Sequence, residues 1–528
     1  MQLVAYGAQD VYLTGNPQIT FWKVTYRRHT NFAMESIEQT FNGQADFGRR
    51  VNCTISRNGD LAYRTYLQVT LPEINQSLHA GDVYARWLDF PGHQLIEQVE
   101  VEIGGQRIDK HYGDWMHIWC QLTLDKNQQA GYNKMVGQTT QLTFMTDPKF
   151  ADIDGPCDSN APRQVCAPRN ALPETTLYIP LQFWFCTNPG LALPLIALQY
   201  HEVKINLDLR AIDECLWAVS TLNGAASTDV KVSAAYSQSL VSASLYVDYI
   251  YLDTDERRRM AQNPAEYLIE QLQFTGSESV GSSSNKIRLN FNHPCKELIW
   301  VVQPDCNVDY CAATQADSTL YKTLGAQPFN YTDALDALPN SVKAFATAES
   351  LEGSYGVISG GVFEQAAVPS ISGNVDWTNS ADDWAAGTTA AASITASGVS
   401  DAGAFVLTET SLDMHCWGEN PVVTAKLQLN GQDRFSEREG TYFDQVQPFQ
   451  HHTRSPDTGI NVYSFALRPE EQQPSGTCNF SRIDNATLQL VLSNATVSGS
   501  NTAKVRVYAR NYNVLRIMSG MGGLAYSN

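Results

Sequence analysis

Two stretches of the chain, far apart in the sequence, alternate between apolar and polar residues and end in the same kind of turn. Residues 98–103 alternate strictly and stop at Gly104-Gly105-Gln106-Arg107. Residues 423–429 alternate in the same way and stop at Asn430-Gly431-Gln432-Asp433-Arg434. A period of two is typical of a β-strand with one buried face, and Gly-Gly and Asn-Gly suit the tight turn of a two-stranded hairpin. The pattern predicts two β-hairpins.

An aromatic cluster follows each predicted hairpin. The members are Tyr112, Trp115 and Trp119 in the first copy and Tyr442, Phe443 and Phe449 in the second. The turn glycines Gly105 and Gly431 are 326 residues apart (431 − 105), which is too long for a solenoid repeat. A duplicated domain explains the recurrence better than two unrelated hairpins.

The rest of the chain predicts mostly strands. Alternating or apolar stretches bounded by Gly, Pro and Asn occur at 66–71, 177–185, 203–209, 245–251, 267–274, 287–291, 298–302, 463–467 and 488–490. Residues 111–124 predict two or three helical turns, and residues 125–175 predict a loop. Strand–turn–strand spacing without a long amphipathic helix is typical of an all-β sandwich or jelly roll. A chain of 528 residues, 43% hydrophobic and 17% charged, can fill two large all-β domains.

Composition divides the chain into four parts. Residues 1–26 lack a sustained period and predict an arm that cannot bury itself alone. Residues 27–252 are the expected first domain, 253–264 a short charged linker, and 265–528 the second domain, with an inserted surface loop at about 304–420 that is rich in Ala, Ser, Thr and Gly. The triplet Arg257-Arg258-Arg259 is read as a solvated turn that pairs with Asp253, Asp255 and Glu256, rather than as an anion-binding patch.

Charge and cysteine usage narrow the function classes. The net charge of −19 disfavours direct binding to nucleic acid, because phosphate backbones are repelled. No signal peptide is recognisable, and the most apolar window, 177–198, contains three prolines that argue against a membrane span. Eleven cysteines without a Cys-x-x-Cys motif predict reduced thiols, although a bridge between Cys306 and Cys311 stays open.

No catalytic, cofactor-binding or metal-binding residue is predicted. The chain has no His-x-His, no His-Glu-x-x-His and no Gly-x-Ser-x-Gly motif. The neighbours His451 and His452 would point to opposite faces of a strand, so they are read as a loop or surface pair. Among six Asn-x-Ser/Thr triplets, Asn330 is the candidate glycosylation site, because it falls in the predicted surface loop.

Several segments resemble one viral protein family. They are GAQDVYLTGNPQITFWKVTYRRHTNFAMESI (residues 7–37), ISRNGDL (55–61), VDYIYLDTDERRRMAQ (247–262), PSGTCNFSRIDNATL (474–488) and residues 505–526. The chain resembles the major capsid proteins of nucleocytoplasmic large DNA viruses, in the form seen in algal and amoebal giant viruses.

The resemblance implies a structural protein without a cofactor. Its expected fold is two consecutive eight-stranded antiparallel jelly-roll barrels, a double jelly roll, with long loop insertions. Its expected role is to homotrimerise into pseudo-hexagonal capsomers of an icosahedral outer shell, in virions assembled in the host cytoplasm. The expected partners are neighbouring capsomers, minor capsid proteins and a penton protein. The arm would lie inside the shell near an internal membrane, and the inserted loop would face outward.

A second hypothesis is a carbohydrate-binding or cupin-like jelly-roll protein, since this fold hosts both. It predicts a metal triad or an aromatic platform for sugars in one barrel mouth. The missing His-x-His argues against a cupin, whereas the aromatic residues of the second half leave a glycan platform open.

Overall fold

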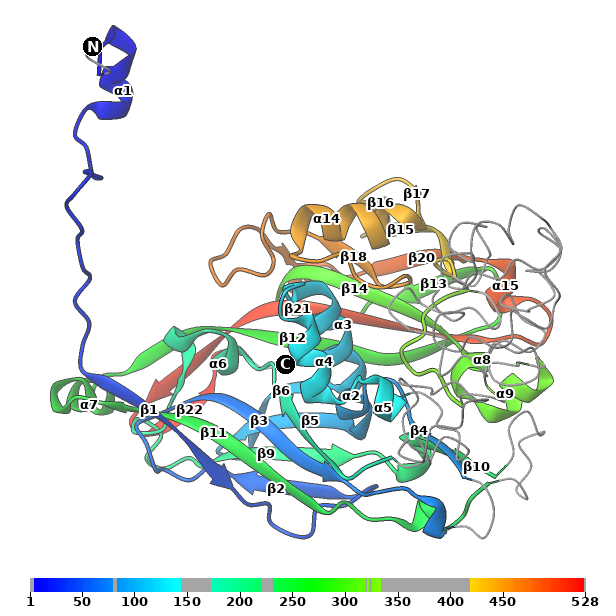
Figure 1. The fold of residues 1–528 in the computed structure, drawn as a ribbon. Coiled ribbons are helices and arrows are strands. Elements are labelled where there is room, and N and C mark those ends of the chain that lie inside the picture. Colours follow the sequence, from blue (N-terminus) through cyan, green and yellow to red (C-terminus); the bar gives the residue numbers. More distant parts are fainter. Residues whose placement is uncertain are drawn as a thin grey trace, which may run out of the picture.

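The computed structural model describes residues 4–78, 83–143, 172–220, 231–316, 318, 321, 325–333 and 418–526. Two β-sandwiches, one from each half of the chain, lie side by side with a helical layer between them (Figure 1). We call the strands before residue 253 the first barrel and those after residue 264 the second barrel.

In the first barrel, two antiparallel sheets enclose one apolar core, with strand orders β1-β11-β3-β7 and β2-β9-β5-β6. The first sheet contains β1 (Phe32–Gln39), β3 (Leu61–Leu71), β7 (Thr175–Pro180) and β11 (Ser242–Leu252), with the short β8 (Leu193–Pro194) beside β3. The second contains β2 (Arg50–Thr54), β5 (Ile96–Ile103), β6 (Gln106–Tyr112) and β9 (Val203–Leu209). A further pair joins β4 (Tyr84–Trp87) to β10 (Leu216–Val219). These crossovers are the Greek-key connections of an eight-stranded jelly roll.

The second barrel repeats this topology strand for strand, in the orders β12-β21-β14-β18 and β13-β20-β15-β16. Its first sheet contains β12 (Ala265–Val280), β14 (Pro294–Pro304), β18 (Asn461–Ser464) and β21 (Ala503–Met518), with β19 (Cys478–Asn479) and β22 (Met521–Leu524) at its margins. Its second sheet contains β13 (Ser284–Arg288), β15 (Val422–Leu429), β16 (Gln432–Asp433), β17 (Arg438–Glu439) and β20 (Ala486–Leu492). The predicted double jelly roll is confirmed.

Both predicted hairpins are present. In the first, Ile103 pairs with Gln106 across a turn in which Gly104 and Gly105 have φ values of 59° and 86°. In the second, Leu429 pairs with Gln432, and Asn430 and Gly431 have φ values of 51° and 79°. Two successive positive φ angles match the right-handed twist of the flanking strands, which explains the selection of glycine and asparagine there.

The helices are short and lie mainly between and around the barrels. They are α1 (Val11–Thr14), α2 (Pro91–Leu95), α3 (Gly113–Thr123), α4 (Gln129–Val136), α5 (Thr140–Thr143), α6 (Trp184–Thr187), α7 (Thr254–Gln262), α8 (Asp305–Val308), α9 (Tyr310–Gln315), the π-helix η11 (Tyr442–Val446), α14 (Gln447–His451) and α15 (Asn494–Val497). The helix predicted at 111–124 is α3. The loop predicted at 125–175 is wrong in part, because α4 and α5 form there, and residues 144–171 lie outside the described residues. Helix α4 buries only Tyr132 and Val136, too few apolar positions for a clear helical pattern.

Strands β12 and β21 of the second barrel complete the core of the first barrel. Ile269, Leu515 and Ile517 of the second barrel are at most 2% exposed and belong to the apolar cluster of the first. The β21–β22 turn is fastened to the first barrel by a hydrogen bond from the Gly522 amide to His201 Nδ1, 3.1 Å long. The two barrels therefore share a continuous interior at this end.

Three predicted segments lie outside the barrels. Residues 4–31 form an arm that extends away from the body (Figure 1). The linker contains α7, and Arg257 Nε pairs with Asp60 Oδ1 at 2.9 Å, so the expected pairing with the acids of its own segment is wrong for this residue. The inserted loop leaves the barrel after Pro304 and returns before Val422, but residues 334–417 lie outside the described residues.

Candidate functional site

The junction between the barrels begins with α3, which directly follows the first hairpin. The first residue of the helix, Gly113, must be glycine, because a Cβ there would overlap the carbonyl oxygens of His93 and Ile96. Its apolar face repeats at i, i+3, i+4 and i+7, a spacing that aligns side chains along one side of a helix. These side chains, all at most 9% exposed, are Trp115, Ile118, Trp119 and Leu122.

The face of α3 packs on the outer surface of the sheet β12-β21-β14-β18. At the centre of this surface is a row of directly paired residues, one from each strand: Phe274, Tyr508, Ile299 and Val462. The rings of Phe274 and Tyr508 stack with their centroids 4.7 Å apart, and Trp115 lies 5.4 Å from Tyr508. The outer face of the second barrel is thus buried by a helix of the first.

A buried ionic cluster lies at one end of this apolar contact. Arg510 Nη1 pairs with Glu297 Oε1 at 2.8 Å, and Arg510 Nη2 pairs with Glu270. The guanidinium carbon of Arg510 lies 3.9 Å from the ring centre of Trp119 on α3, a cation–π contact. The charged side chain of one barrel therefore holds the helix of the other.

Histidine and lysine complete the cluster. His452 Nε2 lies 2.9 Å from Glu297 Oε2, and its Nδ1 lies 2.8 Å from Glu470 Oε1. Lys296 Nζ lies 2.5 Å from Glu270 Oε1. Three cations thus face three carboxylates, and the side chains of His452 and Glu297 are fully buried. Such an arrangement is stable only when each charge keeps its partner.

The electrostatics of the cluster favour the charged forms of His452 and Glu297. Burial alone would lower the pKa of His452, but the carboxylates of Glu297 and Glu470 outweigh it and raise this pKa to about 9. Burial would raise the pKa of Glu297, yet His452 and Arg510 hold it well below its usual range. Burial and the nearby Arg510 lower the pKa of Lys296 to about 8. His452 is therefore an imidazolium at neutral pH.

Polar contacts fix the junction away from the cluster as well. Arg506 Nη1 of the second barrel pairs with Asp114 Oδ2 on α3 at 2.7 Å. The amide of Leu272 on β12 donates to Asp109 Oδ1 on β6 at 3.1 Å. Because these contacts join the edge of one barrel to the face of the other, they restrict both sliding and rotation.

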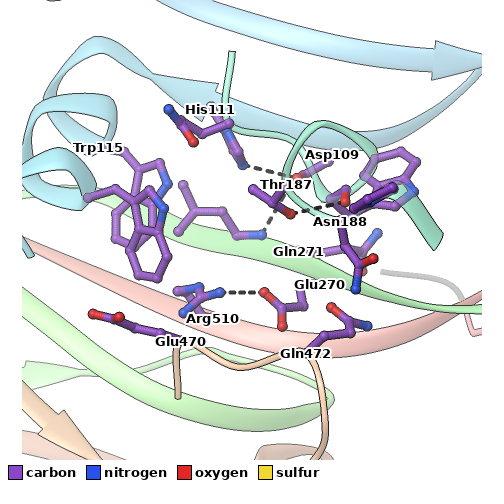
Figure 2. Close-up of a pocket in the computed structure, with 15 residues that line it drawn as sticks. Asp109, His111, Trp115, Thr187, Asn188, Glu270, Gln271, Glu470, Gln472 and Arg510 are labelled. Atoms are coloured by element: carbon purple, nitrogen blue, oxygen red, sulfur yellow. Dashed lines mark hydrogen bonds and ion pairs between the residues drawn. The ribbon is translucent and has the colours of Figure 1, made fainter. Parts of the chain in front are cut away.

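A cleft of about 220 Å³ opens beside the cluster (Figure 2). Figure 2 shows His111 and Asp109 above it and Arg510 and Glu270 below, and His111 Nε2 lies 3.0 Å from Asp109 Oδ2. Three tryptophans line it, but each is at most 9% exposed; they are Trp115, Trp119 and Trp184. Their ring faces are occupied by protein contacts, so they offer no open platform on which a sugar could stack.

Asn330, the candidate glycosylation site, is buried rather than exposed. Asn330 is 2% exposed, and its side-chain oxygen accepts a 2.6 Å hydrogen bond from the Thr332 hydroxyl. Its backbone carbonyl accepts from Gln303 Nε2 at 2.9 Å, which ties the segment to β14. The expected exposure is therefore wrong, while modification at Asn330 stays a prediction that this burial disfavours.

The remaining residues named in the sequence analysis are one histidine pair and one cysteine pair. The reading of His451 and His452 as a loop or surface pair is wrong, because α14 ends there and directs His452 into the ionic cluster. Cys306 and Cys311 are free thiols. Within the described residues, no group of three or more His, Cys, Asp or Glu side chains could hold a metal ion.

Comparison with known proteins assigns the family. Residues 20–253 match the family described as major capsid protein N-terminus, and residues 256–523 match the large eukaryotic DNA virus major capsid protein. The major capsid protein of Phaeocystis pouchetii virus is 77% identical over 529 residues, covering 100% of this chain and 99% of the relative. The chain belongs to the major capsid protein family of large eukaryotic DNA viruses.

Solved structures agree with this membership. A chain of the PBCV-1 virus capsid, in a quasi-atomic model, is 33% identical with a TM-score of 0.59, and the match covers 96% of this chain and 100% of that one. The Faustovirus major capsid protein has a TM-score of 0.60 at 14% identity, with 97% and 94% of the two chains covered, and supports the fold alone. This major capsid protein is thus a structural component of the virion shell and not an enzyme.

In the part of the chain that the structure describes, no helix has the length and apolar character needed to cross a membrane.

Proposed function

We propose that this capsid protein homotrimerises into pseudo-hexagonal capsomers that tile an icosahedral outer shell. In this proposal residues 27–252 and 265–528 are two equivalent building blocks joined by the linker 253–264. The observation that carries it is the repeated strand order, since two barrels of one topology in each of three chains supply six similar units.

The junction between the barrels supports the same proposal. A capsomer can look hexagonal only if the two barrels of a chain keep a constant angle. The α3 contact, the ionic cluster and the Arg506–Asp114 pair bind the barrels on several sides, as a rigid pair requires.

The arm supports a role in contacts beyond the trimer. Phe21 and Trp22 are 99% and 84% exposed, and such aromatic side chains gain stability only when a partner covers them. We propose that residues 1–26 lie on the inner side of the shell, near an internal membrane, and contact minor capsid proteins. Neighbouring capsomers and a penton protein are the remaining proposed partners.

Three further parts of the proposal rest on the family or on charge. The loop at about 304–420 would form the outward surface, and assembly would take place in the host cytoplasm. Direct contact with the genome is not expected, because the net charge of −19 opposes it. The carbohydrate-binding alternative has no supporting feature in the cleft, whose tryptophans are buried.

Size-exclusion chromatography with light scattering tests the trimer. Three chains of 58.4 kDa predict a particle of about 175 kDa, and negative-stain images should show a hexagonal outline. A stable monomer or dimer at micromolar concentration would refute the proposal.

A further inference from the structure

The outer face of the first barrel repeats the row of residues that α3 covers on the second. In the second barrel, Tyr508 of β21 pairs directly with Ile299 of β14. In the first barrel, the strands in the same positions are β11 and β3, and there Tyr246 pairs directly with Tyr66. The rings of Tyr66 and Tyr246 stack at 5.3 Å and 3°, as those of Phe274 and Tyr508 do at 4.7 Å and 17°.

This first-barrel face is open where its counterpart is covered. Tyr508 is 1% and Ile299 0% exposed, whereas Tyr66 and Tyr246 are only half-buried. Beside them on the same sheet, Tyr178 is 40% and Met34 49% exposed. The three tyrosines come from the adjacent strands β11, β3 and β7, and such a contiguous patch is larger than scattered apolar residues on a monomer would form.

The second barrel also carries a counterpart of α3. A helical segment, η11 followed by α14, comes after its hairpin just as α3 follows the first. Val446 and Phe449 are 39% and 81% exposed and are three residues apart, the spacing of Trp115 and Ile118 on α3. The segment lies on the side of the second barrel that faces away from the first (Figure 1). It is therefore free to meet another chain.

We propose that α14 of one copy docks on the outer face of the sheet β1-β11-β3-β7 of the next copy, with Phe449 against Tyr66 and Tyr246. This inference rests on the proposed trimer and deepens it by naming the two surfaces that meet. The contact would repeat between chains the one that α3 makes within a chain. Three contacts within chains and three contacts between chains would then alternate around the trimer and close a ring. A heterologous interface closes in this way when its rotation is right.

The chemistry of the two faces fits a contact that forms after folding. In the internal row, Phe274, Ile299 and Val462 accompany a single tyrosine, Tyr508. The external row pairs two tyrosines, Tyr66 and Tyr246, and Glu38 stands opposite Tyr246. A more polar face keeps a free subunit soluble before assembly, whereas the internal contact never meets water.

The substitution Phe449→Asp tests the inference, because this exposed side chain is not needed for the fold of one chain. An aromatic anchor at the centre of an interface typically accounts for a thirtyfold or larger change in affinity, so the variant should dissociate at least about thirtyfold more readily. The matched control is Val423→Asp, which places the same charge on β15 in the other sheet, at a residue that is 47% exposed. Light scattering should report monomers for the first variant and trimers for the control.

Cross-linking provides a second readout. In a Phe449→Cys, Tyr66→Cys double variant, a short bifunctional maleimide should join position 449 of one chain to position 66 of the next, seen by mass spectrometry as a cross-linked peptide that neither single variant gives, because native thiols such as the exposed Cys311 also react. A Phe449→Asp protein that stays trimeric, or a trimeric double variant that does not cross-link, would overturn the inference and leave the proposed function intact. A monomeric wild-type protein would instead refute both.

Discussion

The substitution His452→Gln removes one charge from the buried cluster and tests whether charge, rather than packing, stabilises the junction. His452 is buried between Glu297 and Glu470, at 2.9 and 2.8 Å. Glutamine has a similar size and retains one donor, and Glu297 keeps its pair with Arg510. The expected loss therefore comes mainly from the missing positive charge.

The magnitude follows from the pKa of His452. An unfolded histidine has a pKa near 6.5, and the carboxylates raise it to about 9 in the fold. At 1.36 kcal/mol for each tenfold step, the protonated imidazole contributes about 3 kcal/mol of stability. Because the folded pKa is the higher one, this contribution is fully present below pH 6.5 and is lost as the pH rises through 9.

The assay is calorimetric melting of wild type and variant between pH 5.5 and pH 10. The unfolding entropy of a 528-residue chain is about 1.1 kcal/mol/K, so the variant should melt about 3 °C lower at pH 6, and the two curves should converge above pH 9. Lys296, whose pKa burial lowers to about 8, titrates in the same range but is present in both proteins. The matched control is His451→Gln, at the neighbouring half-buried residue, which should change little. A cost that is the same at pH 6 and pH 10 would refute the charge argument.

Three further predictions concern the junction, a helix start and the arm. Trp119→Ala should lower stability by about 3–5 kcal/mol in denaturant titration, because it loses both the stack on Trp115 and the contact with Arg510; an effect below about 1 kcal/mol would contradict this. Gly113→Ala should reduce soluble yield and melting temperature, since its Cβ meets backbone carbonyls, whereas Gly131→Ala, in open space on α4, should be neutral or slightly stabilising; equal losses would contradict the steric account. Deletion of residues 1–26 should leave the melting temperature unchanged, because the described part of the arm is exposed, yet should prevent closed shells in electron micrographs of assembly reactions; normal shells would show that the arm is dispensable.

Local patterns predicted the local structure well. The two hairpins depend on an alternation of period two and on residues that accept positive φ, both of which can be read within a dozen positions. Helix α3 is predictable for the same reason, since the residues that indicate it lie in one uninterrupted stretch of the sequence. The repeated hairpin then indicates a repeated barrel, because two copies of one hairpin are expected when the domain that contains it is duplicated.

The ionic cluster was not predicted, because its partners are far apart in the chain. Arg510 occupies a polar position of the alternating strand β21, and such positions normally face water. That face is covered by α3 of the other barrel, and Glu297 itself lies 213 positions from Arg510 in the chain. One signal was available: Lys296 and Glu297 directly precede the uninterrupted apolar run Leu298–Val302 of a buried strand. Asn330 was misplaced for a related reason, since a loop was assumed to be exposed although Gln303 holds it against the barrel.

The sharing of Ile269, Leu515 and Ile517 with the first barrel has a consequence for synthesis. Domains usually fold in the order in which they leave the ribosome. Here the first barrel cannot complete its interior until β12 and β21 of the second half have been synthesised, because Ile269, Leu515 and Ile517 belong to its core. A truncated product would expose apolar surface in both halves, and chaperones and proteases would therefore bind or degrade it. Only a chain that includes β21 can therefore bury the apolar core of both halves.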